Sequence, residues 1–175
     1  MKPLIQNILL GLLTLTFSGC STGYKNEGDT VYYEYWNEGS GQHKNKLEAD
    51  PKTFEILKFK AYAKDDKSVF YKGEKIVGAD AKTFEALCDF YARDKKFGWY
   101  GKDTIQTSNG KTLKVINSYY STDGHDYFYI TNPLKMVTPK TFKFVHGEGD
   151  DECWTTDGKY YYYKTIKFLR TTMKT

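Results

Sequence analysis

After residue 30, short runs of aromatic and aliphatic residues alternate along the chain with polar, turn-forming stretches. The run Thr30–Trp36 predicts a first strand, and the glycine-containing polar stretch Asn37–Asn45 predicts a loop. Between residues 56 and 63 every second residue is apolar, namely Leu57, Phe59, Ala61 and Ala63. This alternation predicts a strand with one buried face, on the side away from Tyr62.

The same pattern returns at a fixed interval. Asp65, Asp94 and Asp123 are each 29 residues apart, and Asp157 follows after 34. Each aspartate lies between two aromatic runs, which predicts the turn of a β-hairpin. The predicted return strands are Val69–Tyr71, Trp99–Tyr100, Tyr127–Ile130 and Tyr160–Lys164. A constant period of this size indicates a repeat architecture, in which each unit buries its apolar residues against its neighbours.

Capping residues precede these hairpins. Asp50-Pro51, Asp80 and Thr138-Pro139 each predict about one helical turn. Each turn is expected to direct a phenylalanine inward: Phe54, Phe84 or Phe142. Asn109-Gly110 instead predicts a further hairpin that replaces the helical turn in the third copy.

Together these signals predict a mainly β fold of about four β-hairpin repeats, each of about 29 residues with a short helical turn. We expect a meander or solenoid-like array, with a closed propeller-like or barrel-like arrangement as the alternative. Sixteen tyrosines and eleven phenylalanines agree with strands. The predicted repeat domain spans residues 30–170, between a flexible tether over 20–29 and a C-terminal tail over 171–175.

The repeat carries a resemblance to a known family. Residues 62–71 read Tyr-Ala-Lys-Asp-Asp-Lys-Ser-Val-Phe-Tyr, and residues 157–162 read Asp-Gly-Lys-Tyr-Tyr-Tyr. With the preceding Ala-Asp-Pro-Lys-Thr-Phe-Glu, they resemble the repeat of the DKNYY family, bacterial cell-envelope proteins of unknown function. The resemblance covers roughly residues 31–165. It implies an envelope location and supplies no catalytic residue.

The N-terminus has the features of a secretory leader. Lys2 is followed by the mostly apolar Leu4–Phe17 and then by Ser18, Gly19 and Cys20. This ending resembles a bacterial lipobox, so residues 1–19 are predicted to be a lipoprotein signal peptide and Cys20 to carry the lipid anchor. An ordinary signal peptide with a chance cysteine is the alternative. Ser21 by resemblance favours the outer membrane in a two-membrane bacterium.

Charge and cysteine content limit the classes of ligand and the covalent links that we expect. The net charge of +4 is spread over mixed Lys, Glu and Asp, which argues against a nucleic-acid ligand. No cofactor is expected besides the lipid on Cys20, through which the protein would contact the membrane. Cys88 and Cys153 remain for a disulfide. They lie two repeats apart, about 19 Å in a flat array by the usual strand spacing. A disulfide would therefore require a curled or closed array, while free thiols fit an open one.

Tyr160–Tyr163 cannot all point inward, because successive residues alternate across a strand. Two of these tyrosines are expected to face the other side, joined by Trp99, Tyr127 and Tyr129 from other copies. Such an aromatic surface can stack on sugar rings. The alternative is that Tyr160, Tyr161, Tyr162 and Tyr163 form cross-strand pairs with their hydroxyls in water.

Signals for metal binding or catalysis are weak. The stretch His146–Cys153 is acidic but lacks the ligand spacing of a calcium or zinc site, so no metal is predicted. His125 lies beside Asp123 and Asp126, where an exposed turn histidine is the alternative to a catalytic dyad. No nucleophile recurs with a histidine in the repeat frame.

The sequence therefore predicts a non-enzymatic, lipid-anchored protein of the bacterial cell envelope. Its expected role is that of a binding or structural module that contacts a protein partner or envelope glycan. The aromatic surface and the stretches Asn37–Asn45 and His146–Cys153 are its candidate contacts. An immunity-type protein that neutralises a toxin and an envelope hydrolase are the alternatives.

Overall fold

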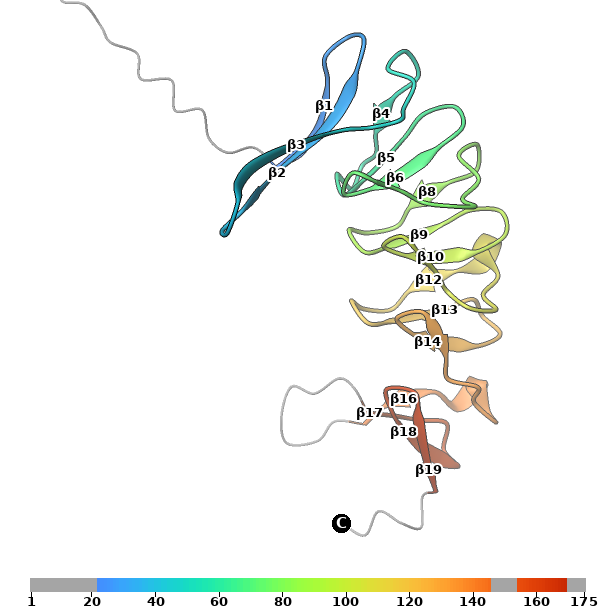
Figure 1. Cartoon of the computed structure of the whole chain (residues 1–175). Helices are drawn as coiled ribbons and strands as arrows, with labels where there is room; N and C mark the ends of the chain where they lie inside the picture. The colour runs from blue at the N-terminus through green and yellow to red at the C-terminus, as the bar shows by residue number, and fades with distance from the viewer. Residues whose placement is uncertain (1–21, 146–153, 170–175) are drawn as a thin grey trace, which may run out of the picture.

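Five small antiparallel sheets succeed one another in chain order. The computed structural model describes residues 22–145 and 154–169. A three-stranded sheet comes first, with the order β1-β2-β3, and four four-stranded sheets come after it. Figure 1 shows these sheets stacked in a row from the N-terminal to the C-terminal end. None closes into a barrel, so the predicted open array of hairpin repeats is confirmed and the closed alternative is excluded.

The N-terminal sheet consists of β1 (Gly23–Asn26), β2 (Val31–Asn37) and β3 (Gly41–Lys46). Unit 1 contains β4 (Glu55–Ile56), β5 (Tyr62–Lys64), β6 (Val69–Tyr71) and β7 (Glu74–Lys75), and unit 2 contains β8 (Glu85–Ala86), β9 (Tyr91–Arg93), β10 (Gly98–Tyr100) and β11 (Asp103–Thr104). Unit 3 contains β12 (Lys114–Val115), β13 (Tyr120–Thr122), β14 (Tyr127–Tyr129) and β15 (Asn132–Pro133). Unit 4 contains β16 (Lys143–Phe144), β17 (Trp154–Thr156), β18 (Tyr160–Tyr163) and β19 (Ile166–Leu169).

Units 1 to 3 bury both faces of their central hairpins. In unit 1, Tyr62 pairs with Tyr71 and Ala63 with Phe70, so neighbouring positions point to opposite faces. The forward face, which points to the next unit, carries Tyr62, Val69 and Ile76 and packs on Phe84, Ala92 and Trp99 of unit 2. The rear face carries Ala63 and Phe70 and packs on Tyr24, Val31 and Tyr33 of the N-terminal sheet. The core therefore lies between the units.

This packing corrects the expected strand with one buried face. Residues 55–63 do not form one strand, because the chain turns between β4 and β5. Tyr62, expected on the polar side, is fully buried in the forward face. A strand that is covered on both sides needs no strict alternation of apolar and polar residues.

The third unit also differs from expectation. Asn109-Gly110 does not form a hairpin; Asn109 instead caps a 3-10 helix, η1 (Gly110–Thr112), and its side chain accepts a hydrogen bond from Lys111 N (3.1 Å). In unit 4, η2 (Pro139–Thr141) occupies the same place. A glycine is needed at Gly110, because a Cβ there would lie 2.2 Å from the carbonyl oxygen of Asp94. Leu113 then takes the position of Phe84 and is buried.

Two further predictions are wrong in the described part of the chain. The proposed tether contains β1, whose Tyr24 is buried and donates a hydrogen bond to the carbonyl oxygen of Ala61 (3.1 Å). The proposed loop Asn37–Asn45 is a hairpin that pairs β2 with β3. The predicted signal peptide (1–19), the insertion 146–153 and the tail 171–175 lie outside the described residues. Among the described residues, no helix is long and apolar enough to cross a membrane.

Candidate binding face at the end of the array

One aspartate organises the hairpin of each unit. In unit 4, Oδ1 of Asp157 accepts hydrogen bonds from the backbone N–H groups of Lys159 (3.0 Å) and Tyr160 (2.7 Å). Oδ2 accepts from Val137 N (2.9 Å) and from the hydroxyl of Tyr162 (2.8 Å). Burial alone would raise the pKa of Asp157, but these donors outweigh it and hold the pKa below its ordinary value.

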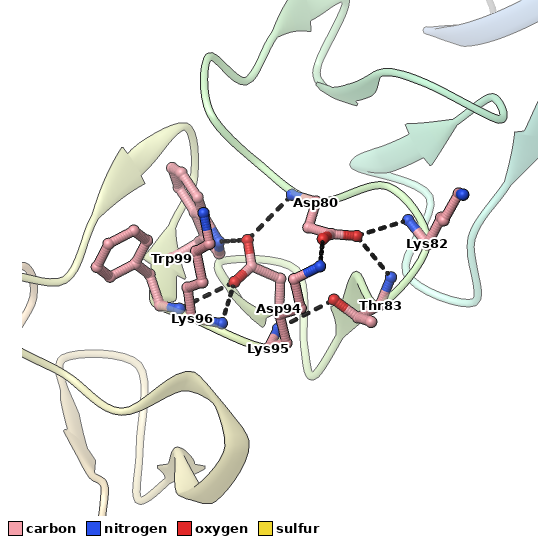
Figure 2. A network of polar contacts seen from close by, with 8 residues as sticks. Asp80, Lys82, Thr83, Asp94, Lys95, Lys96 and Trp99 are labelled. Carbon is pink, nitrogen blue, oxygen red and sulfur yellow. Dashed lines mark hydrogen bonds and ion pairs between the residues drawn. The ribbon is translucent and has the colours of Figure 1, made fainter.

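Figure 2 shows the equivalent network in unit 2. Asp94 accepts from Lys96 N (2.7 Å) in its own turn, from Asp80 N (3.1 Å) and from Nε1 of Trp99 (3.0 Å). The side chain of Asp80 caps the turn over residues 80–83, because it accepts a hydrogen bond from Lys82 N (3.1 Å). In the same way, Asp65 in unit 1 accepts a hydrogen bond from Asp50 N, and Asp123 in unit 3 accepts one from Asn109 N. Each aspartate therefore joins the hairpin of its unit to the capping turn that precedes it.

The fixed hairpin of unit 4 orients a set of apolar side chains. Trp154 pairs with Tyr163, and Thr155 pairs with Tyr162. Thr155 and Tyr162 are fully buried, and Tyr162 packs on unit 3. Alternation therefore directs the neighbouring side chains away from unit 3. We call this surface the end face; it consists of Trp154, Tyr161, Tyr163, Ile166 and Phe168.

Aromatic packing holds the end face together. The ring of Trp154 lies 5.0 Å from that of Tyr163 and 5.6 Å from that of Phe168, measured between centroids. Both contacts are tilted, within the range in which aromatic pairs attract. Figure 1 shows unit 4 as the last sheet of the stack. No described unit comes after it, so the end face has no partner sheet within the described chain.

The equivalent positions of the other units show what this face can do. Trp154 corresponds to Tyr62, Tyr91 and Tyr120, all of which are 0% exposed. Phe168 corresponds to Ile76, Ile105 and Leu134, which are 2%, 0% and 3% exposed. In unit 4 both positions are only partly buried. Ile166 lies at the edge of the end face and is 57% exposed, and its equivalents Glu74, Asp103 and Asn132 are exposed too. The end face thus repeats a surface that, in the other units, binds the next sheet.

The surroundings of the end face are basic. A groove of about 460 Å³ opens beside Tyr161 and is lined also by Lys140, Lys143 and Thr156. Among the described residues from 132 onward, Asp157 is the only carboxylate, and it is buried. The same stretch contains six lysines: Lys135, Lys140, Lys143, Lys159, Lys164 and Lys167. Lys140 and Lys143, which line the groove beside Tyr161, form the rim of the end face and favour a partner with acidic groups.

The structure brings together only part of the predicted aromatic surface. Tyr161 and Tyr163 lie on the end face. Trp99 and Tyr162 are buried as hydrogen-bond donors to Asp94 and Asp157, so neither can contact a ligand.

The remaining predicted tyrosines lie elsewhere in the array. Tyr127 stacks on Phe142 between units 3 and 4, with ring centroids 3.9 Å apart, and Tyr129 stacks on Tyr119. Tyr160 lies beneath Lys167, whose Nζ is 3.8 Å from the ring centroid. Trp154, Ile166 and Phe168 were missed, although the repeat positions of Trp154 and Phe168 could have identified those two as members of a forward face.

The other candidate residues do not form a site among the described residues. Cys88 is half-buried and has no disulfide partner among the described residues, and its sulfur accepts a hydrogen bond from Tyr91 N (3.3 Å). Cys20 and Cys153 lie outside the described chain. His125 is exposed in the turn, and its backbone N–H donates a hydrogen bond to Oδ1 of Asp123 (2.9 Å). No group of three or more His, Cys, Asp or Glu side chains that could hold a metal is found in 22–145 and 154–169.

Comparisons with known proteins give one match. The model of the DKNYY family matches residues 11–103, which is more than half of the 175-residue chain and includes the N-terminal sheet and the first two units. No curated protein and no solved structure matches the chain.

Proposed function

Because the chain belongs to the DKNYY family, we propose that it is a lipid-anchored binding module of the bacterial cell envelope that holds a partner protein on its end face. The observation that carries this proposal is the exposure, in unit 4, of positions that are buried by a neighbouring sheet in units 1 to 3. The lipobox resemblance at Cys20 supports the anchor.

A protein fits the end face better than a glycan does. Between the units, each forward face receives apolar side chains from the next sheet: unit 1, for example, receives Phe84, Ala92 and Trp99. A partner that offers two bulky apolar side chains beside a small one would reproduce this packing. Its rim should be acidic, to complement Lys140 and Lys143.

The proposed role needs no reaction. His125 is placed by its turn and the aspartates by their backbone hydrogen bonds, so folding accounts for both. We expect His125→Ala, combined with alanine at His146 and Asp150, to complement a deletion strain fully. Loss of complementation by this variant, with normal protein levels, would favour the hydrolase alternative.

Photo-crosslinking in living cells tests the binding face. A photoreactive residue at Ile166 should crosslink to one defined envelope protein, while the same residue at Val77, which is 85% exposed on unit 1, should not. Adding Tyr163→Glu to the Ile166 probe should abolish the crosslink.

Three results would contradict the proposal: equal crosslinking at both positions, no crosslink at Ile166, or retention of the crosslink with Tyr163→Glu. Specific retention of purified envelope glycan that is lost with Tyr163→Glu would assign the face to sugar and also reject a protein partner.

A further inference from the structure

A groove at the opposite end of the molecule lies close to the predicted anchor. It has a volume of about 540 Å³ and lies between the N-terminal sheet and unit 1. Its apolar walls include Tyr24, Ile56 and Leu57. Thr22, the first described residue, also lines it, only two residues after Cys20. Two residues span at most about 7 Å, so a lipid on Cys20 would begin at the edge of this groove.

Three lysines, Lys25, Lys60 and Lys72, line the same groove. All three are exposed, and none forms an ion pair within the described part of the chain. Among residues 22–145 and 154–169, no carboxylate lines the groove. By contrast, Lys44 on the N-terminal sheet and Lys64 on unit 1 are paired with Glu27 and Glu55. The groove thus combines apolar walls, unpaired positive charge and proximity to the lipidation site.

From this combination we propose that the groove lies on the membrane surface and binds the headgroup region of an anionic phospholipid. The lysines contact the phosphate, while Tyr24, Ile56 and Leu57 contact the first part of the acyl chain. Amphipathic surfaces with clustered lysines bind anionic bilayers in this way. The inference rests on the proposed anchor at Cys20. It gives the array an orientation in which the N-terminal sheet and unit 1 lie on the membrane and the end face is the part farthest from it.

Lysine footprinting of the anchored protein tests this orientation. The processed full-length protein, purified from membranes, would be reconstituted into vesicles of phosphatidylcholine with or without phosphatidylglycerol, and acetylation of each lysine followed by mass spectrometry. Lys25, Lys60 and Lys72 should react about threefold or more slowly when phosphatidylglycerol is present, because the anionic surface covers them. Lys82 and Lys111, exposed on capping turns of units 2 and 3, serve as internal references and should not change. Unchanged rates at the three groove lysines, or equal slowing at the references, would overturn the proposal.

A charge-reversal pair provides a second measurement. The variant Lys25→Glu/Lys60→Glu/Lys72→Glu should transfer from anionic donor vesicles to acceptor vesicles at least about tenfold faster than the wild type. The control Lys82→Glu/Lys96→Glu/Lys111→Glu has the same net charge but alters exposed turns of units 2 and 3, and it should transfer at the wild-type rate. Equal transfer of the two variants would reject the groove as the contact.

The intact mass of the processed chain separates the two proposals. If Cys20 carries no acyl groups, the anchor in the proposed function fails. If Cys20 is acylated and the groove lysines are not protected, only the orientation proposed here fails.

Discussion

The first and the last described sheets of the array differ in the charge of their outer faces. The outer face of the N-terminal sheet carries charged residues between aromatic ones: Glu34 lies between Tyr32 and Trp36 along β2. Lys44 lies over the Tyr32 ring and pairs with Glu27 and Glu34. The end face of unit 4 carries Trp154, Tyr161 and Phe168. Terminal units of repeat proteins need a polar outer face to stay soluble. The N-terminal sheet therefore acts as a cap, and unit 4 does not.

This difference distinguishes the face of a sheet that is required for folding from a face that is available for binding. The two terminal sheets bury the face that points into the array in the same manner, through Tyr33 at one end and Tyr162 at the other. Only the outward faces differ. An aromatic outward face that folding does not require is the main reason to assign it to a partner.

The largest expected effect compares equivalent positions of units 1 and 4. Tyr62→Ala should lower the free energy of unfolding by about 3–5 kcal/mol, as for other large aromatic residues removed from a core. It also removes the hydrogen bond from Tyr62 to the carbonyl oxygen of Phe90 (2.7 Å). Trp154→Ala should cost less than half as much, because no described sheet covers it. Urea denaturation of both variants measures the difference, and equal losses would show that the end face is covered in the free protein.

Removal of the hairpin aspartate should lower the free energy of unfolding by a similar amount in units 1 and 4. Asp65→Ala and Asp157→Ala should each lower the free energy of unfolding by about 2 kcal/mol, since buried N–H or hydroxyl donors lose their acceptor. Asp66→Ala is the matched control, because Asp66 is exposed and contacts Lys67 (3.8 Å) and Thr53 at the surface. It should change stability by less than about 0.5 kcal/mol. A large loss for Asp66→Ala would assign the effect to turn propensity instead of the acceptor.

Acid should weaken the whole array through the same groups. The pKa values of Asp65, Asp123 and Asp157 lie below the ordinary value, because hydrogen bonds to the carboxylates outweigh the effect of burial. Their contribution to stability is therefore fully present above the unfolded pKa of about 4 and is lost as the pH falls below it towards the folded pKa. Asp126, whose pKa is raised by burial, opposes this trend as a single group. The urea midpoint should be similar at pH 7 and pH 5 and lower at pH 3; a midpoint that rises on acidification would contradict the assignment.

Polar substitution of the end face should have little effect on folding. Ile166→Lys replaces a side chain that is 57% exposed and should change the free energy of unfolding by less than about 0.5 kcal/mol. With the photoreactive residue moved to Phe168 on the same face, Ile166→Lys should nevertheless abolish the crosslink to a partner, because a desolvated charge opposes docking. Trp36→Lys on the cap, where Trp36 is 50% exposed, is the control that should retain the partner.

The smallest effect is expected from the cysteines. Cys88 packs with the residues between units 2 and 3, two units away from Trp154, the neighbour of Cys153. In an open stack this separation exceeds the reach of a disulfide. A reducing agent should leave the melting temperature unchanged, and Cys88→Ala should change the melting temperature only slightly. A clear drop on reduction would instead establish the bridge to Cys153.

Local sequence signals were sufficient for the hairpins but not for the contacts between units. The 29-residue spacing of Asp65, Asp94 and Asp123 correctly predicted turns, since aspartate caps its own turn through backbone groups two and three residues ahead. The second oxygen of each carboxylate reaches a residue 14 to 20 positions upstream, which no local pattern reveals. The role of Asn109 was predicted wrongly because Asn-Gly is compatible both with a hairpin turn and with a helix cap, and the local sequence does not distinguish the two.

The candidate site was harder to predict because the exposure of a face depends on whether another sheet covers it. The Tyr160–Tyr163 run indicated alternation, and Tyr161 and Tyr163 indeed share a face. Trp99 and Tyr162 were misplaced because they hydrogen-bond to buried carboxylates in their own units. Phe168 resembles an ordinary strand residue, and it forms part of a surface only because the described chain has no further sheet beyond unit 4.

The similarity between the end face and the internal forward faces has a consequence for how such chains change length. Duplication of a 29-residue segment at the C-terminal side would place a new sheet on a surface already shaped to receive it. At the other end, Glu34 and Lys44 would have to lose their water to admit a sheet. Relatives are therefore expected to gain or lose copies at the C-terminal end while the first sheet is retained.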